Sequence, residues 1–325
     1  MILIISVEDD WSTNDVIDWL VYKGADFKRI NFDKLNQMSY SININNNHKN
    51  YLECEDMDYL NKTAIIWFRR SSNLGLQDIT KESNIVKIIN KSKYFEESFF
   101  IRAFFHTLNK YCNKWLNNYF TAKNDKFQTL LLAESLNLCV PNTILTTSKK
   151  ELLKFMKIEE NVIIKPIYNI EMLRQENDVF MPYTKELSID DLKYLDINMS
   201  PVLVQRKIEK LYEVRSFYLN GQFYSMAIFS QLSEKTKVDF RKYDTKKPNR
   251  RIPYQLPQEI EKQLNKLMHA LDLNSGSIDL IYGDDNKYYF LEVNPVGQFG
   301  MVSYPCNYYL EEKIAEYLIL NDNLN

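Results

Sequence analysis

The segment Ser277-Ile-Asp-Leu-Ile-Tyr-Gly-Asp-Asp-Asn-Lys-Tyr-Tyr-Phe-Leu-Glu-Val-Asn294 predicts a β-hairpin, because two runs of strand-forming residues flank a polar turn. If residues 283–286 form the loop, Asp279 pairs with Phe290. Side chains alternate between the two faces of a strand. One face is then apolar and is predicted to pack on the core; it carries Ile278, Leu280, Tyr282, Tyr289, Leu291 and Val293.

The opposite face of this hairpin carries Asp279, Glu292 and Asn294, with Asp279 diagonal to Glu292. Neighbouring carboxylates among apolar strand residues are unfavourable without a cation. Mg²⁺ prefers hard oxygen ligands and completes its octahedron with water and phosphate oxygens. The three side chains therefore predict a magnesium site, and a solvated strand face is the competing interpretation.

Two upstream lysines have the character of phosphate ligands. Lys165 ends the apolar run Val162–Lys165 and is followed by Pro166, which places its ammonium at the end of a strand. Lys126 opens a predicted helix, whose N-terminus attracts anions. Lysines that simply reach solvent from a strand end or a helix end are the alternative.

A predicted strand at residues 202–208 has a backbone that could pair with the edge of a purine, as it would with another strand. Glu213 and Arg215 follow as alternate residues and therefore share a face. The carboxylate could accept from ribose hydroxyls, and the guanidinium could hold a carboxylate or phosphate in a forked pair. Ordinary strand pairing and a surface ion pair compete with these roles. Arg241 lies in a stretch rich in charges, for which a solvated loop is the alternative.

The whole chain is predicted to be an α/β protein of three domains. Residues 1–118 begin with a buried strand and an amphipathic helix, and an aromatic-rich helix is expected over 95–118. Residues 119–199 alternate helices and strands. Residues 200–325 are dense in strand signals, including an Asn-Gly hairpin turn at 220–221, and predict a mostly antiparallel sheet.

Composition excludes several classes of protein. The 325 residues are 45% apolar, which supports a sizeable core, and 41 basic against 43 acidic residues give a net charge of −2. Bulk attraction to nucleic acid or anionic membranes is therefore absent. The four cysteines have no metal-binding spacing. No apolar run approaches the ~20 residues of a transmembrane helix, and no signal peptide is recognisable, so we expect a cytoplasmic protein.

The order of these motifs resembles the ATP-grasp superfamily over residues 120–300: two lysines, a hinge strand, an arginine, and finally Asp followed by Glu-x-Asn. The resemblance implies Mg²⁺ and ATP as cofactors. By it, the metal ligands are Asp279, Glu292 and Asn294, and the ATP-binding residues are Lys126, Lys165, Gln205, Arg206, Lys207, Ile208 and Glu213. Arg215 and Arg241 would be catalytic. The glycine-rich loop of many members is missing after Lys165.

Four further segments resemble the microviridin-type peptide maturases, in particular the grasp-with-spasm group: 6–10, 66–70, 239–250 and 292–300. This likeness implies an N-terminal α/β pre-grasp domain, a small central domain and a C-terminal, mostly antiparallel domain. It also implies a ribosomal precursor peptide, with a leader and a core rich in acidic, Thr, Ser and Lys residues, whose side chains become linked as macrocyclic esters or amides.

Two rival functions stay open at this stage. One is a RimK-like amino acid ligase with the same fold, and the other is an ATP-binding regulatory protein without turnover. A homodimer is also left open. Arg69 and Arg70 follow an apolar strand, and α/β sheets often bind ligands at the carboxyl ends of their strands. We expect one of the two arginines to contact acidic side chains of the peptide, with a solubilising role as the alternative.

Overall fold

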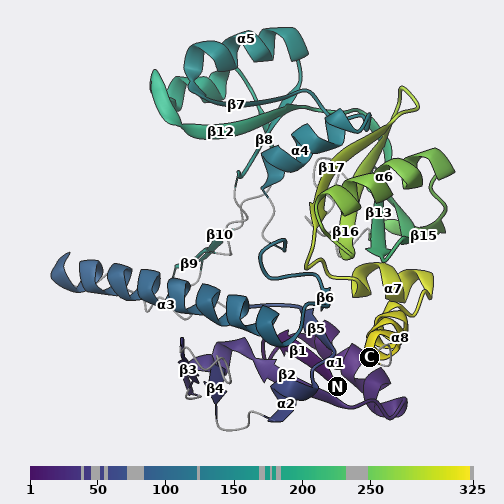
Figure 1. Ribbon diagram of the computed structural model, residues 1–325. Helices are drawn as coiled ribbons and strands as arrows, with labels where there is room; N and C mark the ends of the chain where they lie inside the picture. Colours follow the sequence, from purple (N-terminus) through teal and green to yellow (C-terminus); the bar gives the residue numbers. More distant parts are fainter. Residues whose placement is uncertain are drawn as a thin grey trace. The chain divides into compact units, whose positions relative to one another are not determined.

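The computed structural model describes residues 1–37, 40–44, 52–54, 58–71, 84–122, 125–167, 173–175, 178–180, 184–231 and 248–322. The chain forms two compact units (Figure 1). Unit 1 comprises Met1–Ala122, Gln298–Gly300 and Tyr309–Asn325, and unit 2 comprises Lys123–Gly297 and Met301–Tyr308. The predicted boundary near residue 118 lies close to the start of unit 2, whereas the C-terminal segment groups with unit 1. The division of unit 2 into two subdomains stays a prediction.

Unit 1 is built on a parallel four-stranded sheet with the order β2-β1-β5-β6. All five residues of β1 are buried, as expected for a strand covered on both faces. The strands of this sheet are β1 (Ile2–Ser6), β2 (Phe27–Asn31), β5 (Ile65–Phe68) and β6 (Trp115–Leu116), and a separate antiparallel pair is formed by β3 (Tyr40–Ile42) and β4 (Leu52–Cys54).

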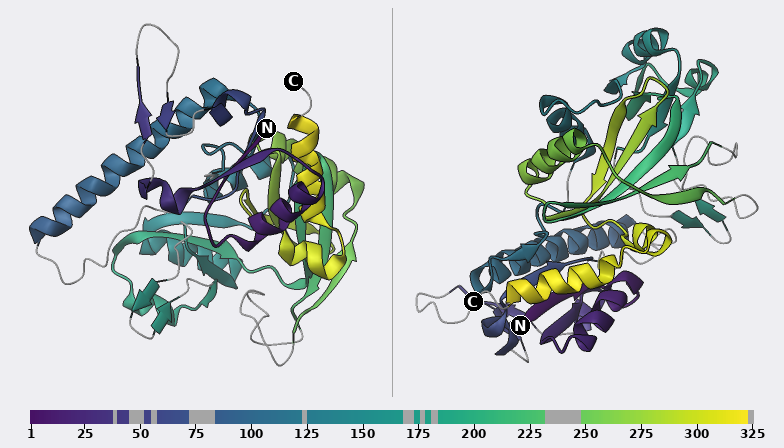
Figure 2. Two further views of the ribbon diagram at one scale, coloured as in Figure 1. Left: turned by 90° about the horizontal axis from the view of Figure 1, so that it is seen from below. Right: turned by 90° about the vertical axis from the view of Figure 1, so that its right-hand side faces the viewer.

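Helices cover the sheet of unit 1. The first and last helices of the chain, α1 (Trp11–Tyr22) and α8 (Leu310–Asp322), pack against each other (Figure 2). The long helix α3 (Asn84–Tyr111) begins earlier than predicted, and its C-terminal part supplies Phe104 and Phe105 to the core. Two short helical segments, η1 (Phe32–Gln37) and α2 (Asp58–Lys62), complete the unit.

Unit 2 contains a four-stranded antiparallel sheet with the order β11-β8-β12-β7. Leu152 and Met156 of α5 pack with Val162 and Val204 of this sheet. The elements of this part are β7 (Thr143–Ser148), α5 (Lys149–Glu159), β8 (Val162–Lys165), β11 (Lys185–Leu187), η2 (Asp190–Tyr194) and β12 (Asn198–Arg206), with a separate pair β9 (Leu173–Gln175) and β10 (Asp178–Phe180). The helix that precedes them, α4 (Lys126–Ser135), packs in the core of the second sheet of this unit.

The second sheet of unit 2 has five antiparallel strands in the order β15-β14-β13-β16-β17. One face packs on α6, which contributes Leu264, Leu267 and Met268 to the core (Figure 2). The elements are β13 (Lys210–Leu219), β14 (Gln222–Phe229), β15 (Arg250–Tyr254), α6 (Gln258–Ala270), β16 (Ser275–Gly283) and β17 (Tyr288–Asn294), followed by the short helix α7 (Gly300–Cys306).

The predicted hairpin is present, but its predicted register is wrong. The loop is one residue shorter, because the Gly283 amide donates to the Lys287 carbonyl at 2.9 Å. A β-bulge then shifts the pairing, so that Leu280 lies opposite Phe290 while Asp279 lies opposite Glu292. Phe290 therefore fills the core position that the sequence assigned to Leu291.

Most predicted elements are found within a few residues, including β8 at Val162–Lys165 and the Asn220–Gly221 turn between β13 and β14. Residues 45–50, which belong to the Asn-rich stretch 43–50 of the sequence, lie outside the described residues. Among the described helices, none is both long enough and apolar enough to span a membrane.

We predict that Gly297→Ala destabilises the fold. A Cβ at Gly297 would lie 2.4 Å from Cβ and Oγ of Ser277, which is buried in β16. Overpacking of this kind costs roughly 1–3 kcal/mol. Chemical denaturation would measure the change, and the double variant with Ser277→Gly should recover part of the loss. An unchanged free energy of unfolding in Gly297→Ala would contradict this close packing.

Candidate active site

The candidate site lies on the face of the five-stranded sheet opposite α6. Asp279 and Glu292 are direct cross-strand partners, closer than the diagonal neighbours that the sequence predicts. Asp279 is 8% exposed. Asn294 lies on the same face, opposite Ser277. The bulge thus places two carboxylates and an amide oxygen on one face of the β16–β17 hairpin.

Arg215 neutralises one of these carboxylates. It lies opposite Asp279 on the neighbouring strand β13, and its Nη1 is 3.0 Å from both oxygens of Asp279. Both side chains are buried, so the pair is strongly favoured by its low-dielectric surroundings once formed. The Nε of Arg215 is buried and has no hydrogen-bond partner within the described part of the chain. One donor of the guanidinium therefore remains for a ligand.

Lys126 approaches the other carboxylate from a helix. It is the first residue of α4, which is capped by Asp125 through a 2.8 Å bond from the Gln128 amide. The Nζ of Lys126 lies 3.5 Å from Oε2 of Glu292. Each of the two acidic side chains is thus paired with one cation from a different element.

Glu213 lies on β13, two residues before Arg215 and on the same face. Its carboxylate accepts from Lys210, and both side chains are almost fully buried. Burial raises the pKa of Glu213, and Lys210 opposes that shift. The carboxylate that is predicted to contact the ribose therefore already forms a buried ion pair with Lys210. Lys210 is not among the residues that the sequence motifs single out.

The remaining predicted ATP ligands belong to the four-stranded sheet. Lys165 ends β8 opposite Leu203 of β12, two residues from Gln205. The Nε2 of Gln205 donates to Thr143 Oγ1 at 2.9 Å. Its Oε1 is buried and has no hydrogen-bond partner among the residues that the structure describes. This acceptor is a candidate for a ligand's donor group.

The end of β12 leads into a short connection to β13. Arg206 still pairs with Val162 of β8, and its guanidinium lies 3.9 Å from Glu159. Lys207 contacts Glu186 at 2.8 Å. Burial alone would lower the pKa of Lys207, but the surrounding carboxylates outweigh it and raise the pKa. β12 is an inner strand, and the backbone amides of Arg206 and Lys207 already donate to the carbonyls of Asn142 and Asn161, at 2.8 and 2.9 Å, so the edge of a purine could not pair with these two amides.

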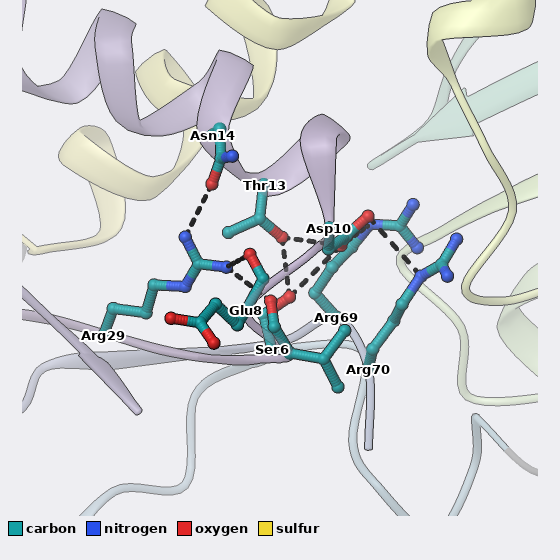
Figure 3. A network of polar contacts seen from close by, with 9 residues as sticks. Ser6, Glu8, Asp10, Thr13, Asn14, Arg29, Arg69 and Arg70 are labelled. Atoms are coloured by element: carbon teal, nitrogen blue, oxygen red, sulfur yellow. Dashed lines mark hydrogen bonds and ion pairs between the residues drawn. The ribbon is translucent and has the colours of Figure 1, made fainter. Parts of the chain in front are cut away.

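Arg241 lies outside the described residues. Arg69 and Arg70 belong to unit 1, where they follow β5 and share the carboxylate of Asp10 (Figure 3). Nε of Arg69 is 3.3 Å from Asp10 Oδ2, and Nε of Arg70 is 3.5 Å from Asp10 Oδ1. Ser6 and Thr13 also donate to Asp10, at 3.2 and 2.7 Å. The two arginines are therefore ordered by a common acceptor.

The two arginines differ in their environment. The Arg69 side chain is 3% exposed and lies over the ring of Phe299 at 5.7 Å, whereas that of Arg70 is 37% exposed. Burial lowers the pKa of Arg69 to about 10, and Asp10 opposes this shift. Arg69 therefore stays charged at neutral pH. A purely solubilising role does not fit a guanidinium buried to this extent.

Sequence reasoning missed several residues of these clusters. In the sequence, Asp10 is singled out only as part of the segment 6–10. Its position between a buried strand and a helix is a further signal that could have identified it. Lys210 precedes Glu213 by only three residues, and this short spacing of opposite charges could have indicated the ion pair. Ser277 lies two residues before Asp279 and therefore shares its face by strand alternation, but only the pairing with Asn294 shows its place beside these side chains.

Three solved structures are similar to the chain over nearly its whole length. Macrocyclase MdnC bound with precursor peptide MdnA, from Microcystis aeruginosa MRC, is 25% identical with a TM-score of 0.80 and 98% of this chain and 99% of that chain covered. A Chryseobacterium gregarium RiPP-associated ATP-grasp ligase in complex with ADP and a leader and core peptide is 23% identical, with a TM-score of 0.79. The similarity covers 98% of this chain and 96% of that chain.

ATP-grasp ligase PsnB, complexed with minimal precursor, Mg and ADP, is 17% identical with a TM-score of 0.79 and 99% of this chain and 97% of that chain covered. No protein-family model and no curated protein matches the chain. The chain has the ATP-grasp fold, and the resemblance to ATP-grasp peptide maturases that its motifs predict is confirmed.

We predict that Asp10→Asn destabilises unit 1 by roughly 3 kcal/mol, because it removes the buried charge that Arg69 faces. Thermal and chemical denaturation would measure the effect. The matched control is Glu8→Gln, whose half-exposed carboxylate pairs only with Lys34 among the described residues and should change stability by about 0.5 kcal/mol or less. Equal effects of the two changes would contradict the structural role of Asp10.

Proposed function

We propose that this ATP-grasp chain is a ligase that uses ATP and Mg²⁺ to join Asp or Glu side chains of a ribosomal precursor peptide to its Ser, Thr or Lys side chains. The observation that carries this proposal is the facing pair Asp279 and Glu292, flanked by Arg215 and Lys126, on a fold shared with a macrocyclase along nearly the whole of both chains. The products would be macrocyclic esters or amides.

The residues fit a magnesium ion. Asp279, Glu292 and Asn294 offer only hard oxygen donors, which Mg²⁺ prefers. Within the described residues no group of three or more acidic, His or Cys side chains has a metal-binding arrangement, so phosphate oxygens and water would supply the remaining ligands. When bound, the ion would offset negative charge on the phosphates during phosphoryl transfer.

The chain's own residues would bind and orient the nucleotide. Lys126 and Lys165 would contact phosphates, the segment from Gln205 to Ile208 would line the adenine, and Glu213 would face the ribose. The unpaired Oε1 of Gln205 supports this assignment, because a buried amide oxygen without a donor is costly. Lys126 already lies beside the carboxylate of Glu292, where a metal-bound phosphate would need a cation.

The reaction has two steps. A peptide carboxylate attacks the γ-phosphorus of ATP and gives an acyl phosphate and ADP. A hydroxyl or amine of the same peptide then attacks the acyl carbon, and phosphate leaves with formation of an ester or amide. Arg215 would stabilise the developing negative charge through its unpaired Nε. We assign a similar role to Arg241, on the family resemblance. The consumption of ATP fits the cytoplasm, which we propose as the location.

We predict that Glu292→Gln abolishes ligation while the fold survives. The change keeps the size of the side chain but removes one negative charge from the metal site, so Mg²⁺ binds more weakly and ADP release falls by about 100-fold or more. Ring formation must fall with it, because the acyl phosphate precedes cyclisation. Mass spectrometry of the peptide, in which each ring removes one water, and an ADP assay measure both.

The matched control is Glu134→Gln, at an exposed position on α4, which should leave both rates unchanged. Near wild-type cyclisation by folded Glu292→Gln would overturn the metal assignment. Equal activity on free glutamate would favour a RimK-like amino acid ligase, and ATP binding without any turnover would favour a regulatory protein.

A further inference from the structure

The cluster around Asp10 has a charge and a shape that the proposed phosphoryl transfer does not use. Asp10, Arg69 and Arg70 together carry one net positive charge, and they lie where β1 and β5 end and α1 begins (Figure 3). Carboxyl ends of parallel strands are the usual place for ligands in α/β sheets. The two guanidinium groups differ in how accessible they are to a ligand.

Arg69 is the less accessible of the two. Its guanidinium is buried between Asp10 and the ring of Phe299. Its backbone amide, like that of Arg70, donates to the Ile5 carbonyl, at 2.8 and 3.3 Å. This shared acceptor fixes the backbone from which both side chains leave the sheet. Arg69 therefore supports the cluster from inside the protein, and we do not expect a ligand to reach it.

Arg70 differs because only one edge of its guanidinium is used. Asp10 is its sole ionic partner within the part of the chain that the structure describes, and the contact is made by Nε. Figure 3 shows the two terminal nitrogens directed away from Asp10. A planar pair of N–H donors at a partly exposed position matches the two oxygens of a carboxylate. Because Asp10 already orients the side chain, a ligand would meet a group with little rotamer freedom left to lose.

We infer that Arg70 forms a carboxylate-binding subsite in unit 1 that holds an acidic side chain of the precursor peptide. This inference rests on the proposed function for the identity of the ligand, but the subsite itself rests on the geometry around Asp10. The subsite contributes to peptide affinity and selects acidic residues. It takes no part in phosphoryl transfer, which belongs to the residues of unit 2.

The net charge of −2 makes the inference testable with a simple probe, since the protein as a whole does not attract acidic peptides. The probe is a fluorescein-labelled synthetic peptide in which glutamates alternate with threonines, and its counterpart has glutamine at every glutamate position. Fluorescence anisotropy on the full chain measures the affinity for each. The wild-type protein should bind the glutamate peptide more tightly.

Arg70→Gln should reduce this preference by about tenfold, because one charge-assisted forked contact is lost. Arg70→Lys keeps the charge without the fork and should retain part of the preference; it also serves if the Gln variant fails to fold. The matched control is Arg102→Gln, an exposed arginine of α3 in the same unit, which should behave as wild type.

Equal binding of the two peptides by the wild-type protein, or an unchanged preference in Arg70→Gln, would overturn the inference. An ADP assay with MgATP on the same proteins separates it from the proposed function. A wild-type protein that forms ADP but binds the two peptides equally rejects the subsite alone. A glutamate preference that depends on Arg70, in a protein without Mg²⁺-dependent ADP formation, rejects the ligase assignment alone.

Discussion

Two carboxylates that face each other on adjacent strands set the constraint on which the rest of unit 2 depends. Asp279 and Glu292 would repel each other if they were left without cations. Arg215 on β13 and Lys126 on α4 supply one positive charge each. The five-stranded sheet must therefore keep β13 beside β16, and α4 must begin where β17 ends. A divalent ion and nucleotide phosphates would enter a place where charges are already balanced in pairs.

The opposite face of the same strands explains why this arrangement is stable. Ile278, Leu280, Phe290 and Val293 are buried against α6, so the hairpin cannot change its register without moving apolar side chains into solvent. A slip of one residue would also turn the carboxylates toward the core, where an unpaired charge is costly. The packing of the apolar face thus fixes the positions of the carboxylates on the opposite face.

The sequence was sufficient for part of this account. Alternating residues predicted which carboxylates share a face, and strand and helix patterns located most elements, because both signals are local. The β-bulge in β17 was not predictable, since nothing in the residues around Leu291 marks an extra unpaired position; the packing of Phe290 in the core selects it. The ionic partners of Asp10 and Asp279 come from residues distant in the chain, and only the fold brings them together.

The central claim is that Asp279, Glu292 and Asn294 hold the divalent ion. Crystals of the chain grown with ADP and Mn²⁺ in place of Mg²⁺ would locate the ion directly through its anomalous scattering. The account predicts an anomalous peak bonded to oxygens of Asp279 and Glu292, with Asn294 beside them and the nucleotide phosphates as further ligands. A peak bound only by phosphates and water, with Arg215 and Lys126 still paired to their carboxylates, would contradict it.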